Sequence, residues 1–156
     1  MKSGDDILAQ KKALLGMCVA KLREKVAMLK TAMDEAQKDA NEHKGAMESR
    51  YDTFKEEAQA LRDGFARQIQ ETGEALAMLE QAEPHPSSII QLGAIVVTSK
   101  GRYFISTGLL DSDIALDGHE YQLVSFASPL MKAMRQVRVG TDVTFGKEKF
   151  RLVEIL

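Results

Sequence analysis

Three carboxylates lie near residue 40 and could do chemistry with a metal ion. Asp39 and Glu42 are three residues apart, and Glu48 follows six residues later. If a helix persists through this segment, a spacing of three puts Asp39 and Glu42 on one face. Mg²⁺ prefers oxygen ligands and typically accepts one or two carboxylates while it keeps several waters. The pair could therefore help to hold one Mg²⁺, although the same spacing is common on ordinary solvated helices.

Other reactive side chains show no pattern of a catalytic or metal site. His43, His85 and His119 share no metal-ligand spacing with one another or with Cys18, which argues against zinc. Cys18 is the single cysteine of the chain, so no internal disulfide can form within this sequence. A lone thiol on a leucine-rich helix is usually a small buried hydrophobe, and a reducing cytoplasm fits it best.

Two long segments that flank the carboxylates carry a seven-residue repeat. In the first, it consists of Leu8, Leu15, Leu22, Leu29 and Ala36, interleaved with Lys12, Val19, Val26, Met33 and Ala40. In the second, it consists of Met47, Phe54, Leu61, Gln68, Ala75 and Ala82, interleaved with Tyr51, Ala58, Phe65, Thr72 and Leu79. Such heptads predict two helices joined by a coiled-coil seam.

The segment between the two repeats predicts a turn. Residues 41–45 read Asn-Glu-His-Lys-Gly, in which Asn and Gly suit a helix end. Helices on either side would then fold back as an antiparallel hairpin on the order of 50 Å long. Open dimerisation through the same seam is the structural alternative.

A second region begins after residues 84–88, Pro-His-Pro-Ser-Ser, because prolines end a helix and favour extended backbone. Candidate strands cover residues 89–98, 102–106, 121–126, 143–145 and 150–155. A short helix over residues 129–136 has Ser128 as its N-cap and Pro129 at its first position. We therefore expect an α+β protein with a helical hairpin at 1–83, a Pro-rich linker at 84–88 and a small β domain at 89–156.

The balance of charge favours a protein partner over nucleic acid. Residues 1–83 carry 13 basic and 16 acidic side chains, and residues 87–156 carry 8 and 7. Neither half has the excess of Lys and Arg that binding to phosphates requires. With 44% hydrophobic and 28% charged residues, and no apolar run near the ~20 residues that span a bilayer, we expect a soluble, cytoplasmic protein without a membrane partner.

Three C-terminal segments resemble the ending of the Gre transcript cleavage factors (GreA and GreB). These are Ser-Pro-Leu-Met-Lys-Ala-Met at 128–134, Val-Gly-Thr-Asp-Val at 139–143 and Phe-Arg-Leu-Val-Glu-Ile at 150–155. In that family, a Ser-Pro-Leu helix, a Gly-Asp turn and a final strand close an FKBP-like antiparallel β domain with one short helix. Here Thr141 is inserted between Gly140 and Asp142. The stretch Tyr-Asp-Thr-Phe-Lys-Glu-Glu at 51–57 is similar to the family's second helix just past its tip.

The tip departs from the family pattern Gly-Asp-Leu-Ser-Glu-Asn. An ungapped count back from Tyr51 puts Lys44 and Met47 on its two acidic positions, and neither residue can hold a metal. A longer tip restores the Asp-x-x-Glu spacing at Asp39 and Glu42, with Glu48 as a third carboxylate.

The resemblance implies a transcription elongation factor that binds RNA polymerase and is not an enzyme itself. Its tip would enter the secondary channel and stimulate the polymerase's own cleavage of backtracked RNA. Asp39 and Glu42, with Glu48 in reserve, would hold a catalytic Mg²⁺ jointly with the polymerase, and the chain would have no cofactor of its own. It would meet the RNA 3′ end only within that complex, and DNA only indirectly. A face near Ser128, Pro129 and Leu130 would bind the polymerase.

Two other functions stay open on the sequence. The altered tip permits a Gre-like regulator or inhibitor that occupies the secondary channel without cleavage activity. The chain could also be a coiled-coil and FKBP-like protein-interaction module. The charge of the first region suits insertion toward a metal, since residues 11–30 hold six basic side chains and one acidic, whereas residues 34–63 hold nine acidic and five basic.

Overall fold

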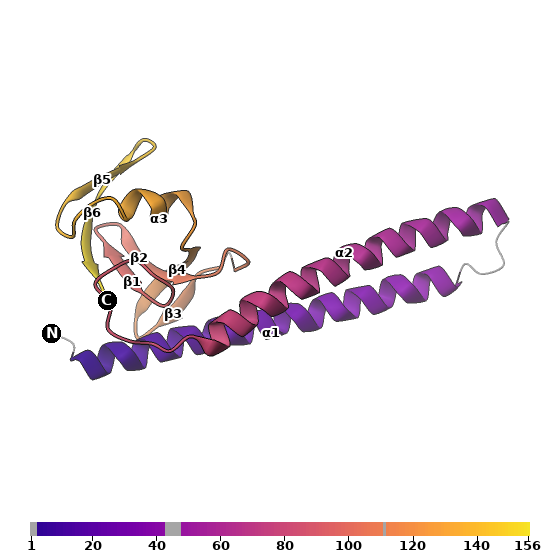
Figure 1. Cartoon of the computed structure of the whole chain (residues 1–156), viewed down its shortest axis with the longest axis horizontal. Helices are drawn as coiled ribbons and strands as arrows, with labels where there is room; N and C mark the ends of the chain where they lie inside the picture. The colour runs from indigo at the N-terminus through magenta and orange to yellow at the C-terminus, as the bar shows by residue number, and fades with distance from the viewer. Residues whose placement is uncertain (1–2, 43–47, 111) are drawn as a thin grey trace. The chain divides into compact units, whose positions relative to one another are not determined.

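The fold is α+β, as the sequence predicts. The computed structural model describes residues 3–42, 48–110 and 112–156 (Figure 1). Two long helices, α1 (Gly4–Glu42) and α2 (Glu48–Gln81), are followed by six strands and a short helix. The strands are β1 (Ile95–Thr98), β2 (Gly101–Ser106), β3 (Ile114–Leu116), β4 (His119–Ser125), β5 (Asp142–Phe145) and β6 (Glu148–Ile155), and α3 (Pro129–Met134) lies between β4 and β5. In the described part of the chain, no helix is both long enough and apolar enough to cross a membrane.

The chain divides into two compact units. One unit consists of Met1–Ala20 and Met78–Leu156, and the other is Lys21–Ala77. The first therefore contains the beginning of α1, the end of α2 and the whole sheet, and the second contains only helix among its described residues. The division into domains at residues 84–88 stays a prediction.

The start of α1 is fixed by reciprocal capping. The Asp6 amide donates to Ser3 Oγ at 3.3 Å, and the Ser3 amide donates to the Asp6 carboxylate at 3.4 Å. Each bond satisfies a backbone donor that the helix itself cannot pair. Asp5 and Asp6 also place negative charge in the first turn, where the helix dipole favours it. The other long helix, α2, ends at Gln81, before the extended residues that lead to Pro84.

Within residues 21–77, α1 and α2 run side by side in opposite directions (Figure 1). A hydrogen bond from Arg62 to the Gln37 side chain, 3.0 Å long, joins the two helices. The described side chains that are buried in this unit are few and small or medium in size: Leu22, Ala36 and Thr72. The antiparallel helical pair of the prediction is therefore present, with a narrow buried seam.

The seam does not follow a strict seven-residue repeat. The repeat predicts Lys12 on it, but Lys12 is exposed and Lys11, at 2% exposure, is buried instead. On α2, Gln68 is exposed where the repeat would bury it, and its neighbour Ile69 is half-buried. An α-helix has 3.6 residues per turn, so residues seven apart drift by about 20° around the helix. The buried face therefore passes to neighbouring residues along each helix.

The sheet has the strand order β3-β4-β2-β1-β6-β5. Four of its neighbouring pairs are antiparallel, but β2 and β4 are parallel, so the sheet is mixed and the wholly antiparallel expectation is wrong in this detail. The cause is β3, a strand that the sequence patterns do not predict. Asp117 and Gly118, with φ of 52° and 79°, form a tight turn between β3 and β4. Because β3 returns along the sheet edge before this turn, β4 runs in the direction of β2.

One face of the sheet and α3 enclose an apolar core. Its buried members are Ile90, Ala94, Val96, Ile105, Met131, Met134, Val143, Phe150 and Leu152. The opposite face carries a second buried row, in which Ile95 pairs with Phe104 and Phe104 pairs with Leu123. Residues on both faces of this sheet are therefore buried.

Most predicted element bounds after residue 88 hold, with two exceptions. The strand expected over residues 89–98 begins only at Ile95, because Gly93 has a φ of 85° that breaks the extended run. The helix expected over 129–136 ends at Met134. The hairpin of β1 and β2, the strand β4 and the final pair β5 and β6 lie close to their predicted positions.

Candidate functional site

The carboxylate pair lies on the last turn of α1. Asp39 is exposed, and Asn41 beside it is exposed as well. The helix continues through Asn41 to Glu42, so the turn expected to begin at Asn41 does not begin there. Since no Gly or Pro stands between Asp39 and Glu42, nothing in the sequence stops the helix earlier. Helical positions 39 and 42 therefore lie on one face, as the metal hypothesis requires.

The other predicted tip residues are only partly described. His43, Lys44 and Gly45 lie outside the described residues, as do the side chains of Glu42 and Glu48. The backbone of Glu48 begins α2. Among the side chains that the structure describes, no group of three or more His, Cys, Asp or Glu is arranged to hold a metal ion. The assignment of Asp39, Glu42 and Glu48 to a shared Mg²⁺ stays a prediction.

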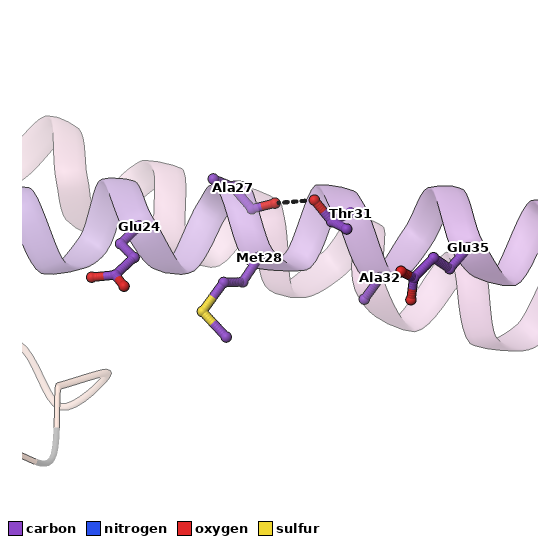
Figure 2. A pocket seen from close by; sticks show the side chains of 6 residues that line it. All are labelled: Glu24, Ala27, Met28, Thr31, Ala32 and Glu35. Carbon is purple, nitrogen blue, oxygen red and sulfur yellow. Dashed lines mark hydrogen bonds between the residues drawn. The ribbon is translucent and has the colours of Figure 1, made fainter.

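A shallow groove runs along α1 within the helical unit. Figure 2 shows Met28 projecting from the helix between Glu24 on one side and Glu35 on the other. Met28 is 67% exposed, and the remaining lining residues are Ala27, Thr31 and Ala32. Thr31 Oγ1 donates to the Ala27 carbonyl at 3.1 Å, so the threonine hydroxyl is satisfied within the helix. This face is apolar at its centre and acidic at its ends.

The residues predicted to bind polymerase lie at the beginning of α3. Ser128 is the N-cap, and its Oγ accepts the Met131 amide at 3.2 Å. Pro129 is exposed at the first turn, where its missing amide costs nothing. Leu130 is half-buried against the core. Ser128 and Leu130 therefore have structural roles, and a binding role for all three stays a prediction.

A second groove, of about 400 Å³, lies at the other end of α3. Ile89 and Val139, exposed by 61% and 49%, line it together with Arg135 and Arg138. The sequence patterns do not reveal this groove, because residues 88–90, 134, 135, 137–139 and 155 come together only in the fold. The local signal was Arg-Gln-Val-Arg-Val at 135–139, which places two arginines beside two valines outside any predicted strand.

A buried lysine fixes the beginning of α1 to the segment after α2. Lys11 Nζ donates to the His85 carbonyl at 2.8 Å. Burial lowers the pKa of Lys11 below its ordinary value, because desolvation disfavours the ammonium form. The neighbouring Gln10 has a buried Oε1 without a hydrogen-bond partner among the described residues. The side chains of Lys11 and Gln10 are buried, so their chemistry concerns folding rather than an exposed site.

Solved structures that are similar to this chain include two that carry the name Gfh1. One is a crystal structure of GreA factor homolog 1 (Gfh1) of Thermus thermophilus, with a TM-score of 0.36 and 23% identity over 88% of this chain and 94% of that one. The other is a structure of the transcription factor Gfh1, with a TM-score of 0.33 and 20% identity over 88% of this chain and 92% of that one. No family model and no curated protein matches the sequence.

Proposed function

We propose that the chain is a transcription elongation factor that binds RNA polymerase and stimulates the polymerase's own cleavage of backtracked RNA. The end of the helical pair enters the secondary channel, where Asp39 and Glu42 help to hold a catalytic Mg²⁺. The chain itself is not an enzyme and has no resident metal. The observation that carries the proposal is the exposed Asp39 on the last turn of α1, in a chain whose C-terminal segments resemble the Gre factors.

The helical pair is long and narrow within residues 21–77. The portion of α1 from residue 21 to its end is about 33 Å long at 1.5 Å per residue, and α2 returns beside it. A helical pair of this kind can carry a carboxylate at one end, far from residue 21 at its other end, with few buried residues. Its exposed acids then remain available to a metal in a partner protein.

The chemistry needs added carboxylates because one of two catalytic ions is held weakly. In two-metal phosphodiester cleavage, one ion activates water and the other stabilises the leaving oxygen. Oxygen ligands from the factor would raise the occupancy of the weakly held ion. Asp39 supplies the exposed oxygen ligand that the structure describes, and Glu42 is the helical position beside it.

The test is RNA shortening in backtracked elongation complexes made with purified RNA polymerase. Wild type should accelerate cleavage, and Asp39→Asn should slow the stimulated reaction about tenfold or more at limiting Mg²⁺. The loss should shrink as Mg²⁺ is raised, because the carboxylate acts by retaining the ion. The double variant Asp39→Asn with Glu42→Gln should lose more. Asp63→Asn, which removes an exposed acid on the other helix, α2, is the matched control.

Other outcomes point to the alternatives. If wild type binds the polymerase and leaves cleavage unchanged or slower, the chain is a channel regulator without cleavage activity. If it does not bind the polymerase at all, the interaction-module alternative replaces the proposal.

A further inference from the structure

The two most exposed large apolar side chains among the described residues lie in oppositely charged surroundings. Met28, 67% exposed, projects from α1 in the groove that has acidic ends (Figure 2), and Ile89, 61% exposed, lines the groove at the end of α3 that has arginines. Single exposed hydrophobic side chains are normal on a protein surface. Two of them in patches of opposite charge, in contrast, give one chain two surfaces that complement each other.

The acidic patch is a stripe on one side of α1, which we call the Met28 face. Glu24, Met28, Thr31 and Glu35 follow one another at spacings of four, three and four residues, so they share one face of the helix. Along the helix axis, Glu24 lies about 6 Å before Met28 and Glu35 about 10 Å after it. Among the described residues that line this face, none is basic. Methionine is flexible and polarisable, so Met28 can fit an apolar gap of irregular shape.

The basic patch is the groove at the C-terminal end of α3. Ile89 and Val139 are its exposed apolar walls, and Arg135 and Arg138 line it beside them. Among the described residues around the groove, none is acidic, so no carboxylate of its own lining neutralises the two guanidinium groups. The Arg135 guanidinium lies 3.9 Å from the centre of the Phe126 ring. Stacking of this kind orients the guanidinium plane, and the N–H groups at its edge can bind a carboxylate.

We infer that the Met28 face of one copy of this chain docks in the arginine-lined groove of a second copy. Met28 enters between the two apolar walls of the groove, and the glutamates that flank it pair with the arginines. Charge disfavours the other pairings of these surfaces. Two Met28 faces would bring glutamates together and two grooves would bring arginines together, and like charges across an interface are costly. The inference goes beyond the proposed function, because the contact needs no polymerase.

The contact joins two different surfaces, and each copy carries both. It can therefore form twice within a closed pair of copies, or once and leave one surface of each kind open to a further copy. A few side chains bury less area than a stable interface needs, so we expect weak association that increases with protein concentration. Exposed charges are screened as the Debye length falls from about 30 Å at 0.01 M salt to about 3 Å at 1 M. Added salt should therefore weaken the association.

The experiment measures self-association of the purified full chain by sedimentation velocity over a series of protein concentrations. Met28→Asp should weaken the association about tenfold or more, because it removes the apolar side chain that enters the groove. Arg135→Glu should weaken it to a similar degree, because it places a carboxylate where the glutamates dock. Met78→Asp, at 59% exposure on α2, and Lys132→Glu, on α3 outside the groove, are the matched controls and should change it by about twofold or less.

A mixture of the two variants tests which surfaces meet. Met28→Asp keeps an intact groove, and Arg135→Glu keeps an intact Met28 face, so each variant supplies the surface that the other lacks. An equimolar mixture should therefore form heterodimers, although neither variant associates alone. A fluorescent label on one variant follows this in sedimentation. A chain with both substitutions has neither surface and should associate with neither single variant.

Three results would overturn the inference. If wild type stays monomeric at every concentration, no second copy occupies the groove. If the two variants associate as tightly as their controls, the contact uses other surfaces. If the variants lose association but their mixture does not regain it, the Met28 face and the groove do not meet each other. Circular dichroism checks the fold of each variant, and Val139→Asp replaces Arg135→Glu if the latter fails to fold.

Discussion

The sheet and the helical pair of residues 21–77 differ in how much apolar surface each buries. Nine buried residues form one cluster between α3 and the sheet. In the described part of the helical pair, the buried side chains are Leu22, Ala36 and Thr72, and most other seam positions are half-buried. The sheet is therefore stabilised by contacts between segments far apart in sequence, and the helical pair by a thin line of contacts.

Because of this difference, the two regions tolerate substitutions to different degrees. A change inside the sheet core leaves a cavity that packed neighbours cannot fill. On the helical pair, most described positions are exposed or half-buried, so a substitution there leaves a smaller cavity. The end of α1 can therefore change its acids without loss of fold, and the tip is where this sequence departs from the Gre pattern. The arginine-lined groove lies on the more densely packed region, which holds its walls in place.

The largest expected effect is in the sheet core. Phe150→Ala, at a residue 5% exposed on β6, should lower the free energy of unfolding by about 3–5 kcal/mol, because it removes a buried ring and leaves a cavity. Urea unfolding followed by circular dichroism measures the change. Phe145→Ala, at 38% exposure on the paired strand β5, is the matched control and should cost much less. Equal losses at the two positions would mean that the hairpin does not pack as described.

The long helices could be predicted from sequence because their signal is local and repeated. Parts of the sheet could not. Strand β3 has only three residues, and its one signal is the Asp117-Gly118 dipeptide, which suits a two-residue turn. The parallel pairing of β2 with β4 depends on the path of the chain through β3, which no pattern within β2 or β4 encodes.

Of the candidate sites, one could be predicted from the sequence and the other could not. The acids of the tip could be chosen from sequence, because Asp39 and Glu42 are neighbours on one helix and their spacing is visible in the chain. The groove could not, because Ile89, Arg135 and Val139 come from separate segments. Its walls are set by the turn after α3 and by the segment that leads into β1. The sequence pattern places Ile89 in the strand expected over residues 89–98, whereas β1 begins at Ile95.

A smaller effect tests the register of the helical pair. Ile69→Ala should lower the free energy of unfolding by about 1–2 kcal/mol, since Ile69 is a half-buried seam residue. Gln68→Ala should change it by less than about 0.5 kcal/mol, because Gln68 is exposed. The two variants are matched in position, and unfolding in urea can be followed by the far-ultraviolet circular dichroism of the helices. The strict seven-residue repeat predicts the reverse order. A larger loss for Gln68→Ala than for Ile69→Ala would therefore mean that the strict repeat describes the seam.

The smallest expected effect is a change of slope with pH at Lys11. Burial holds the pKa of Lys11 below its ordinary value of 10.5, so between the two values the unfolded chain binds more protons than the folded one. The free energy of unfolding should therefore rise with pH through this window, as the penalty for a buried ammonium is relieved. Lys11→Met keeps the length of the side chain and should lack this rise. Lys12→Met, which removes the exposed neighbour, should retain it. Urea unfolding across the alkaline range, compared as differences from wild type, measures the slope, and identical slopes in all three proteins would show that Lys11 is not desolvated.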